Sequence, residues 1–337
     1  MSNFKEVISF ESLYRAHLRA RLGKRGKKEV IMFEQNLSDN IIKLHYDLLY
    51  KRYKVSGYHS FMIYDPKERE IQAISYIDRV VQHSICDNYL MPLLEKRLIY
   101  DNTACRKNKG TDFAIKRLRK FMTDNYKKNK NNGYFVKVDI SKYFNNIDHD
   151  VLKNILSKVI TDKDILNLLF LIIDSYNFDT NKGLPMGNQT SQCFALLYLD
   201  SIDRVVKEEL GIKHYVRYMD DIIIITNNKD NAKKCLDVIN ENVNKKNLTL
   251  NYKSQIIKTK NGINFLGYHF YYTGSGKIIQ KIKKENKKRL IKKVKHKIKI
   301  KDSLLNKNFS LNSYKGFLKR GNNYYLYKKV EKMYKNC

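Results

Sequence analysis

Three aspartates are the residues whose type and setting could do chemistry. Asp139 lies near the end of an apolar run at residues 134–140, and Asp220 and Asp221 join two apolar runs within residues 214–225. Carboxylates that crowd together repel one another and raise each other's pKa unless a cation joins them. Hard oxygen ligands suit Mg²⁺, and two such ions about 3.5–4 Å apart can activate an attacking hydroxyl and stabilise a leaving oxygen in nucleotidyl transfer. An isolated Asp-Asp pair is more often a solvated turn, but the upstream aspartate favours a metal site.

The elements that must position these aspartates follow from the pattern of apolar residues. The turn signal Asn132-Gly133 precedes a predicted strand at 134–140, and residues 214–225 predict a hairpin with the acidic pair at its tip. Further strands are predicted at 61–64, at 70–74 and near Leu248 and Phe265, and helices at 38–53, 78–94, 111–130, 231–243 and after Asp148 and Asn188. This order predicts an α+β fold with an antiparallel sheet and helices packed on one face.

The charge of the chain indicates its class of partner. The 337 residues include 66 Lys and Arg against 34 Asp and Glu, which gives a formal net charge of +32. Such a chain repels itself unless a polyanion screens it, so nucleic acid is the expected partner. Lysine abundance also follows from an A+T-rich coding sequence, but that does not account for acids placed at strand ends. Lysine dominates from Lys277 onward, and an apolar helical stripe within residues 284–299 predicts a small C-terminal helical unit.

The expected cellular setting is the cytoplasm, without a membrane. No apolar run approaches the roughly 20 residues that span a bilayer, and the first residues lack the continuous apolar segment of a signal peptide. The 5 cysteines are scattered and never in CxxC spacing. This argues against a disulfide framework or a zinc site and fits a reducing compartment.

Four motifs in a shared order carry a resemblance to reverse transcriptases. The string YMDD at residues 218–221 resembles the palm signature of that family, and VDISKYFNNIDH at 138–149 resembles its first acidic motif. The strings GLPMGNQTSQ at 183–192 and NFLGY at 264–268 resemble its template-and-nucleotide motif and its primer-grip segment. Chance agreement of several ordered motifs is far less common than a single match.

The resemblance extends over roughly residues 10–330 and implies a right-hand polymerase fold. Fingers and palm, with an antiparallel sheet, would occupy residues 1–270, and a small, basic α-helical thumb residues 271–337. The implied activity is that of an RNA-directed DNA polymerase, which makes cDNA from dNTPs on a template RNA. The implied cofactors are two Mg²⁺ ions, with Mn²⁺ as a substitute. The implied catalytic residues are Asp139, Asp220 and Asp221, and the same aspartates with Ile140 are the implied metal ligands.

The other site residues are implied by their places in the motifs. Phe144 lies five positions after Asp139, at the steric-gate position, where a rigid ring would clash with a 2′-hydroxyl. The implied nucleotide-binding residues are Lys67, Arg69, Phe144, Met186 and Gly187. The implied template and primer contacts are Arg79, Ser191, Gln192, Phe265, Leu266 and Gly267. Lys253 is a candidate proton donor to pyrophosphate.

Two positions in the template-and-nucleotide motif resemble one branch of the group II intron-like lineage, the enzymes of diversity-generating retroelements. Met186 is an apolar residue before Gly187, and Gln192 stands where many members have proline. The strings at 100–111 and 313–318 resemble the same branch. This resemblance implies error-prone copying at template adenines, in a bacterium or encoded by its phage. It also implies an RNA/DNA duplex and a small basic accessory protein that forms a pentameric ring as partners.

Two alternatives stay open at the level of sequence. Defence-associated and abortive-infection reverse transcriptases share much of this pattern. A catalytically inactive RNA-binding protein with a polymerase fold is the other alternative. The intact set of Asp139, Asp220 and Asp221 favours an enzyme, because a pure binder gains nothing from three acids beside a polyanion.

Overall fold

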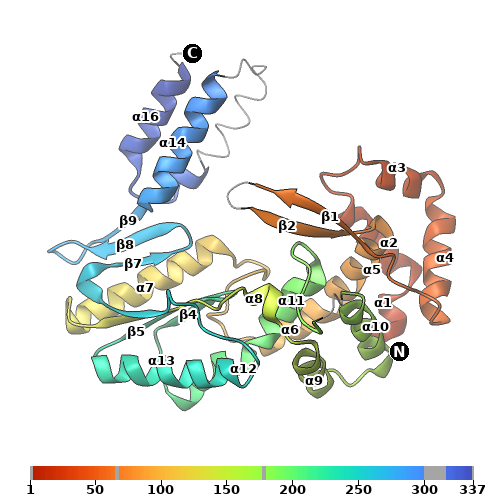
Figure 1. Cartoon of the computed structure of the whole chain (residues 1–337), viewed down its shortest axis with the longest axis horizontal. Coiled ribbons are helices and arrows are strands. Elements are labelled where there is room, and N and C mark those ends of the chain that lie inside the picture. Colours follow the sequence, from red (N-terminus) through yellow and green to blue (C-terminus); the bar gives the residue numbers. More distant parts are fainter. Residues whose placement is uncertain (1–2, 65–67, 177–179, 300–315, 336–337) are drawn as a thin grey trace.

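The computed structural model describes residues 3–64, 68–176, 180–299 and 316–335. Figure 1 shows the N-terminal helices and a two-stranded hairpin at one end of the molecule and the central sheet towards the other, with two C-terminal helices projecting beyond a second sheet. All strand pairs between named strands are antiparallel. Within the described ranges, none of the helices is both long and apolar enough to cross a membrane.

A four-stranded sheet in the order β4-β5-β3-β6 forms the centre of the fold. Its strands are β3 (Tyr134–Val138), β4 (Tyr215–Tyr218), β5 (Asp221–Thr226) and β6 (Gln255–Lys258). The two-residue turn Met219-Asp220 joins β4 to β5, as the sequence predicts, and β3 pairs with β5 along its whole length. The central sheet therefore brings the predicted hairpin beside the predicted strand.

Helices cover both faces of this sheet, so the prediction of helices on one face is wrong. Ile222 and Ile224 of β5 pack in one apolar cluster with α13 (Lys229–Asn244). Ile223 and Ile225 pack in a second cluster with α7 (Thr111–Asn129). The reason is visible in β5, whose apolar residues are continuous and do not alternate with polar ones, as expected of a strand buried on both faces.

The strand predicted near Leu248 is absent. Leu248 donates its backbone N–H to Val243 O in the turn that ends α13, so it is not free to join a sheet ladder. Leu250 makes only an isolated antiparallel bridge, to Ile140. The nearest strand, β6, begins at Gln255 and pairs with β3 at the edge of the sheet.

Helices and a two-stranded hairpin make up the N-terminal part. The hairpin consists of β1 (Tyr58–Ile63) and β2 (Arg69–Ile74). The helices are α1 (Asn3–Val7), α2 (Phe10–Ala20), α3 (Lys28–Gln35), α4 (Leu37–Leu49), α5 (Tyr76–Ile85), the π-helical η1 (Cys86–Leu90) and α6 (Met91–Arg97). The helix predicted at 78–94 is thus α5, η1 and α6 in succession, and it begins early because Ser75 caps it, accepting a hydrogen bond from Asp78 N at 3.2 Å.

Several helices lie between β3 and β4 in the chain. They are α8 (Tyr143–Asn146), α9 (His149–Val159), α10 (Lys163–Asp174), α11 (Gln189–Tyr198), α12 (Asp200–Arg204) and the π-helical η2 (Val205–Glu209). The helix predicted after Asp148 is α9, and Asp148 caps it: its Oδ1 accepts from the backbone N–H groups of Asp150 and Val151, both at 3.1 Å.

A three-stranded sheet in the order β7-β8-β9 follows the short helix η3 (Thr259–Asn261). Its strands are β7 (Ile263–Phe265), β8 (Tyr268–Tyr272) and β9 (Ile278–Ile282), and the helices α14 (Lys284–Lys299) and α16 (Tyr324–Lys335) come after them. Leu266 and Gly267 join β7 to β8 with φ +46° and +87°, the two left-handed positions of a type I′ turn. The predicted boundary at residue 270 falls inside β8, and the division into fingers, palm and thumb stays a prediction.

Gly262 should be essential to this sheet. Its φ is +72°, and a Cβ added there would lie 2.4 Å from the carbonyl oxygen of Phe270. We expect Gly262→Ala to lower the free energy of unfolding by about 3 kcal/mol, through left-handed strain and displacement of β8. Thermal and urea unfolding would measure this. Gly274→Ala is the matched control, because nothing lies within 4 Å of its added Cβ; equal unfolding midpoints for the two variants would contradict the prediction.

Candidate functional site

The pairing of β3 with β5 brings the three predicted carboxylates together. Val138 pairs with Ile222, so the next step along the antiparallel ladder places Asp139 beside Asp221. Asp220 lies in the two-residue turn immediately before β5. Residues far apart in the sequence thus converge at one end of the central sheet.

The environment of Asp221 shows the electrostatic strain of this arrangement. Burial raises the pKa of its carboxyl to about 7; Lys137 opposes the rise, and the negative charges of Asp220 and Asp139 add to it. The Asp221 side chain is 27% exposed, yet its Oδ1 atom is buried and has no hydrogen-bond partner. Lys137 Nζ lies 3.8 Å from that oxygen. A divalent cation would satisfy both the unpaired oxygen and the crowded charge, so the residues fit a metal site.

The carboxylates do not form a closed coordination sphere by themselves. Among the described residues, no group of three or more His, Cys, Asp or Glu side chains is gathered in the geometry of a metal site. The aspartates would therefore have to close around an ion as it binds.

The backbone of Asp139 is fixed by the loop that precedes β6. Ser254 Oγ accepts from Asp139 N and donates to Asp139 O, both at 3.0 Å, and Asn251 N donates to the same carbonyl at 2.7 Å. Lys253, the candidate proton donor, belongs to this loop and is exposed, and its backbone N–H donates to Asn251 Oδ1 at 3.1 Å. The loop thus ties the position of Lys253 to that of Asp139. Ile140, next to Asp139, is buried.

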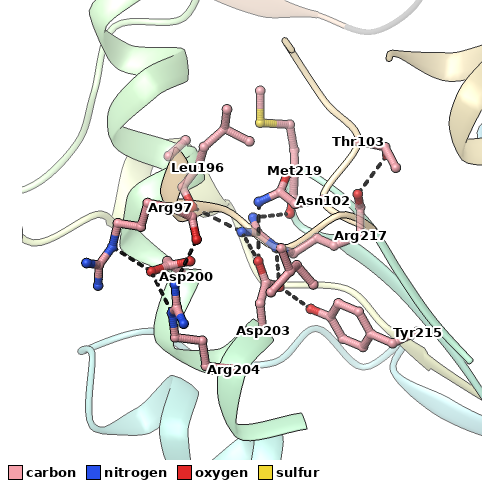
Figure 2. Close-up of polar contacts among 12 residues, drawn as sticks. Arg97, Asn102, Thr103, Leu196, Asp200, Asp203, Arg204, Tyr215, Arg217 and Met219 are labelled. Carbon is pink, nitrogen blue, oxygen red and sulfur yellow. Dashed lines mark hydrogen bonds and ion pairs between the residues drawn. The ribbon is translucent and has the colours of Figure 1, made fainter. Parts of the chain in front are cut away.

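A buried arginine supports the turn that carries Asp220. Figure 2 shows Arg217 of β4 between Asp203 of α12 and the carbonyl oxygen of Met219. Met219 has a left-handed backbone, with φ +56°, and its side chain is buried. Neither Arg217 nor Asp203 stands out in the sequence, because a charged residue in a short strand or helix is ordinarily expected to face solvent.

The predicted nucleotide-binding residues come from three separate elements. Phe144 lies on α8, half-buried, with its ring 5.6 Å from that of Tyr143. Met186 and Gly187 form the turn before α11, and Gly187 is exposed with φ +102°. Arg69 is the first residue of β2 and pairs with Ile63. Lys67 lies outside the described residues.

A cavity of about 270 Å³ brings together members of the nucleotide and template sets. Arg79 of α5, Gly187 and Gln192 line it. Asn188 and Gln189 also line it, and Asn188 Nδ2 and Gln189 Oε1 are buried atoms with no hydrogen-bond partner. Sequence reasoning did not single out these two amides, although both belong to the GLPMGNQTSQ string. Ser191 does not line this cavity and is 1% exposed.

A lysine-lined groove of about 940 Å³ includes Lys137, whose Nζ lies 3.8 Å from Asp221 Oδ1. It runs between the β6 edge of the central sheet, the second sheet and the C-terminal helices, and Glu285 is the acidic residue in its lining. Its lysines are Lys137, Lys253, Lys281, Lys283, Lys284 and Lys287. Burial and the nearby Lys137 lower the pKa of Lys283. The sequence predicts many basic residues in this region but does not distinguish the ones that line the groove.

The predicted primer-grip residues lie in the β7–β8 hairpin, which belongs to the three-stranded sheet that lines the groove. Phe265 is fully buried, whereas Leu266 and Gly267 make the turn. The Gly267 carbonyl accepts from Lys283 N at 3.1 Å and from Asn286 Nδ2 at 3.2 Å. These bonds anchor the turn to the start of α14.

The sequence and the fold of the chain resemble those of known proteins. Two Saccharomyces cerevisiae proteins named for COX1/OXI3 intron 2 and intron 1 are 26% and 21% identical to the chain over 40% and 58% of its length. The chain spans 23% and 30% of the length of these relatives.

Apo telomerase from Candida tropicalis, truncated from its C-terminal domain, shares the fold with a TM-score of 0.51 at 18% identity. The match covers 66% of this chain and 55% of that one. The predicted class, a right-hand polymerase fold of mixed helices and antiparallel sheets, is confirmed by this likeness. Residues 65–270 match the family model described as reverse transcriptase (RNA-dependent DNA polymerase). Because that match covers more than half of the chain, the protein belongs to the reverse transcriptase family.

Proposed function

We propose that this protein is an RNA-directed DNA polymerase that makes cDNA on a template RNA. The observation that carries the proposal is the ladder between β3 and β5, which sets Asp139 beside Asp221 with Asp220 in the adjoining turn. Family membership supports the same activity. The protein would work in the cytoplasm of a bacterium, encoded by the bacterium or its phage.

The carboxylates are suited to hold the divalent cations of nucleotidyl transfer. Asp139, Asp220 and Asp221, with the backbone of Ile140, would hold two Mg²⁺ ions, and Mn²⁺ would substitute. When bound, such ions supply Lewis-acid stabilisation of the attacking and leaving oxygens. Lys137 Nζ lies 3.8 Å from Asp221 Oδ1, and the loop at Ser254 holds the Asp139 backbone in place. Lys253 would donate a proton to the departing pyrophosphate.

The surrounding residues are suited to hold nucleotide, template and primer. Lys67 and Arg69 would grip the triphosphate through charge-assisted hydrogen bonds, and Phe144 would exclude a 2′-hydroxyl. Arg79, Gly187 and Gln192 line the cavity in which the template strand and incoming nucleotide would meet. The lysine-lined groove, with the Leu266-Gly267 turn beside it, would follow the backbone of an RNA/DNA duplex, because such duplexes are recognised mainly by shape and phosphate.

Primer extension tests this function. A DNA primer annealed to an RNA template, with all four dNTPs and Mg²⁺, should be extended to an alkali-stable product, and chelation of the metal should stop the reaction. No dNTP incorporation with either Mg²⁺ or Mn²⁺ would contradict the proposal and favour an inactive RNA-binding protein.

We further propose that the cDNA serves a diversity-generating retroelement. The support is in the sequence: Met186 before Gly187 and Gln192 in place of proline. The partner would be a small basic protein that forms a pentameric ring and shares the template RNA. Sequencing of the cDNA separates this role from phage defence, because errors concentrated at template adenines favour diversification, whereas random or homopolymeric product favours defence.

Met186→Gln should make copying more accurate. The thioether cannot make the amide hydrogen bonds of glutamine, so an amide at this turn should hold the incoming nucleotide more tightly in register. We expect the error frequency at template adenines to fall about tenfold, as measured by cDNA sequencing. Met32→Gln, an exposed methionine on α3, is the control and should leave errors unchanged. An unchanged error frequency in Met186→Gln would count against this account of the position.

A further inference from the structure

A buried ion pair joins the hairpin that carries Asp220 and Asp221 to helix α12. The side chains of Arg217 and Asp203 are both 0% exposed, with Arg217 Nη2 2.6 Å from Asp203 Oδ2 and Arg217 Nε 2.7 Å from Oδ1. Removing two charges from water is so unfavourable that such pairs often add no net stability. Stability alone therefore does not explain the pair, and the contacts around it point to a role in placing other groups.

The remaining donors of Arg217 reach two backbone carbonyls on different elements. Arg217 Nη1 donates to Met219 O in the turn, and Arg217 Nη2 donates to Leu196 O in α11, both at 3.0 Å. A guanidinium holds its donors in one rigid plane, so these contacts together define a single geometry. Met219 needs such support, because a left-handed backbone at a residue other than glycine persists only where its surroundings hold it.

The position of Arg217 is itself fixed from every side. Asp203 also accepts from Asn102 Nδ2, at 3.2 Å, and from the hydroxyl of Tyr215. On the backbone, Arg217 O accepts from Thr103 N at 2.9 Å and from Thr103 Oγ1 at 2.8 Å, and Arg217 N donates to Asp101 O at 3.0 Å. Figure 2 shows Thr103, Leu196 and Asp203, which come from separate segments of the chain, around Arg217.

We propose that Arg217 is a positioning residue that fixes the Met219-Asp220 turn against helix α11. The helix follows the Met186-Gly187 turn, so one side chain sets the placement of the carboxylates relative to the nucleotide side of the site. The proposal rests on the proposed polymerase function and deepens it. Arg217 is buried and touches no substrate; it acts through the turn, where small displacements of a reacting group cause large losses of rate.

Arg217→Lys is the sharpest test. Lysine keeps the charge beside Asp203, but its single ammonium cannot also serve two carbonyls on separate elements. We expect kcat for dNTP incorporation to fall about tenfold or more, with KM for dNTP within about twofold of wild type. The Mg²⁺ concentration for half-maximal rate should rise, and so should the Mn²⁺ dissociation constant measured by electron paramagnetic resonance. Backbone amides of residues 215–226 should exchange hydrogen faster in the metal-free protein.

Arg97→Lys is the matched control. Arg97 makes its ion pair with Asp200, at 2.8 Å, on the same helix α12, so the same substitution is made beside the same element. This variant should keep wild-type kcat, Mn²⁺ affinity and hydrogen exchange at residues 215–226. If Arg217→Lys behaves like this control, or if both variants lose activity equally, the proposal is overturned.

A variant without the buried charges covers the case in which Arg217→Lys does not fold. Arg217→Met, Asp203→Leu and Tyr215→Phe together remove both charges and the hydroxyl that would lose its acceptor. A folded triple variant with slow turnover and fast exchange at the turn supports the proposal, and one with wild-type values overturns it. Failure of both variants to fold would also overturn it, since the network would then be needed for folding and not for placing the turn. If the wild type binds Mn²⁺ but extends no primer, the polymerase function fails by itself, and Mn²⁺ affinity and hydrogen exchange still decide the role of Arg217.

Discussion

Asp220→Ala is expected to reduce RNA-templated primer extension by at least about 1,000-fold while the protein stays folded. Asp220 lies in the turn beside β5, and its negative charge adds to burial in raising the pKa of Asp221. Without Asp220, only Asp139 and Asp221 would remain to hold the divalent cations. The loss should appear in kcat under saturating dNTP and Mg²⁺. Circular dichroism and the midpoint of thermal unfolding should stay close to wild type, because the residue is half-buried in a turn.

The matched control is Asp230→Ala, which removes an exposed aspartate from the first turn of α13. This variant changes the net charge by the same amount as Asp220→Ala but leaves Asp139, Asp220 and Asp221 intact, so it should retain full activity. Wild-type extension rates in Asp220→Ala would show that the chemistry does not depend on this acid and would remove the polymerase mechanism from the site.

Phe144→Ala should open the enzyme to ribonucleotides. We expect the efficiency of rNTP incorporation relative to dNTP to rise on the order of 100-fold, because the ring that would meet a 2′-hydroxyl is gone. The residue lies on α8 shortly after Asp139, and its ring is held edge-on by Tyr143, with 69° between the ring planes. Single-nucleotide incorporation with matched dNTP and rNTP would measure kcat/KM for each.

Phe170→Ala is the control for the loss of packing that any Phe→Ala substitution causes, separate from a loss of sugar discrimination. Phe170 of α10 is likewise half-buried against the same apolar cluster as Phe144. This variant should lose comparable stability without a change in sugar discrimination. If Phe144→Ala keeps the wild-type preference for dNTP, the ring does not act as a gate.

The acidic residues of the candidate site were easier to single out from the sequence than the residues that hold them in place. Asp139, Asp220 and Asp221 could be recognised because each interrupts or ends an apolar run. Their convergence depends on the register between β3 and β5, which pairs residues distant in the sequence and leaves no local trace. Lys137 and Arg217 escaped notice for a related reason: each is one charged residue in a strand of a lysine-rich chain, and its partner lies on another element.

The fold was predictable where local rules decide it. The hairpin around Met219-Asp220 and the cap at Asp148 are short-range features with clear residue preferences. The covering of both sheet faces was not predicted, because an apolar run such as Ile222–Ile225 shows that a strand is buried without showing what buries it. The strand expected at Leu248 does not form, because the backbone N–H of Leu248 already donates to Val243 O in the turn that ends α13.

The order of strands in the central sheet also governs when the candidate site can form during synthesis of the chain. β3 and β5 lie side by side, but helices α8 to α12 and β4 separate them along the chain. During synthesis on the ribosome, β3 leaves the ribosome before β5 does, so β3 cannot form its pairing with β5 until β5 has been made. Strand pairing between residues so distant in sequence forms slowly. Truncated chains that end before β5 would therefore lack the paired aspartates and would have no polymerase activity. The activity would appear only in a late, cooperative folding step.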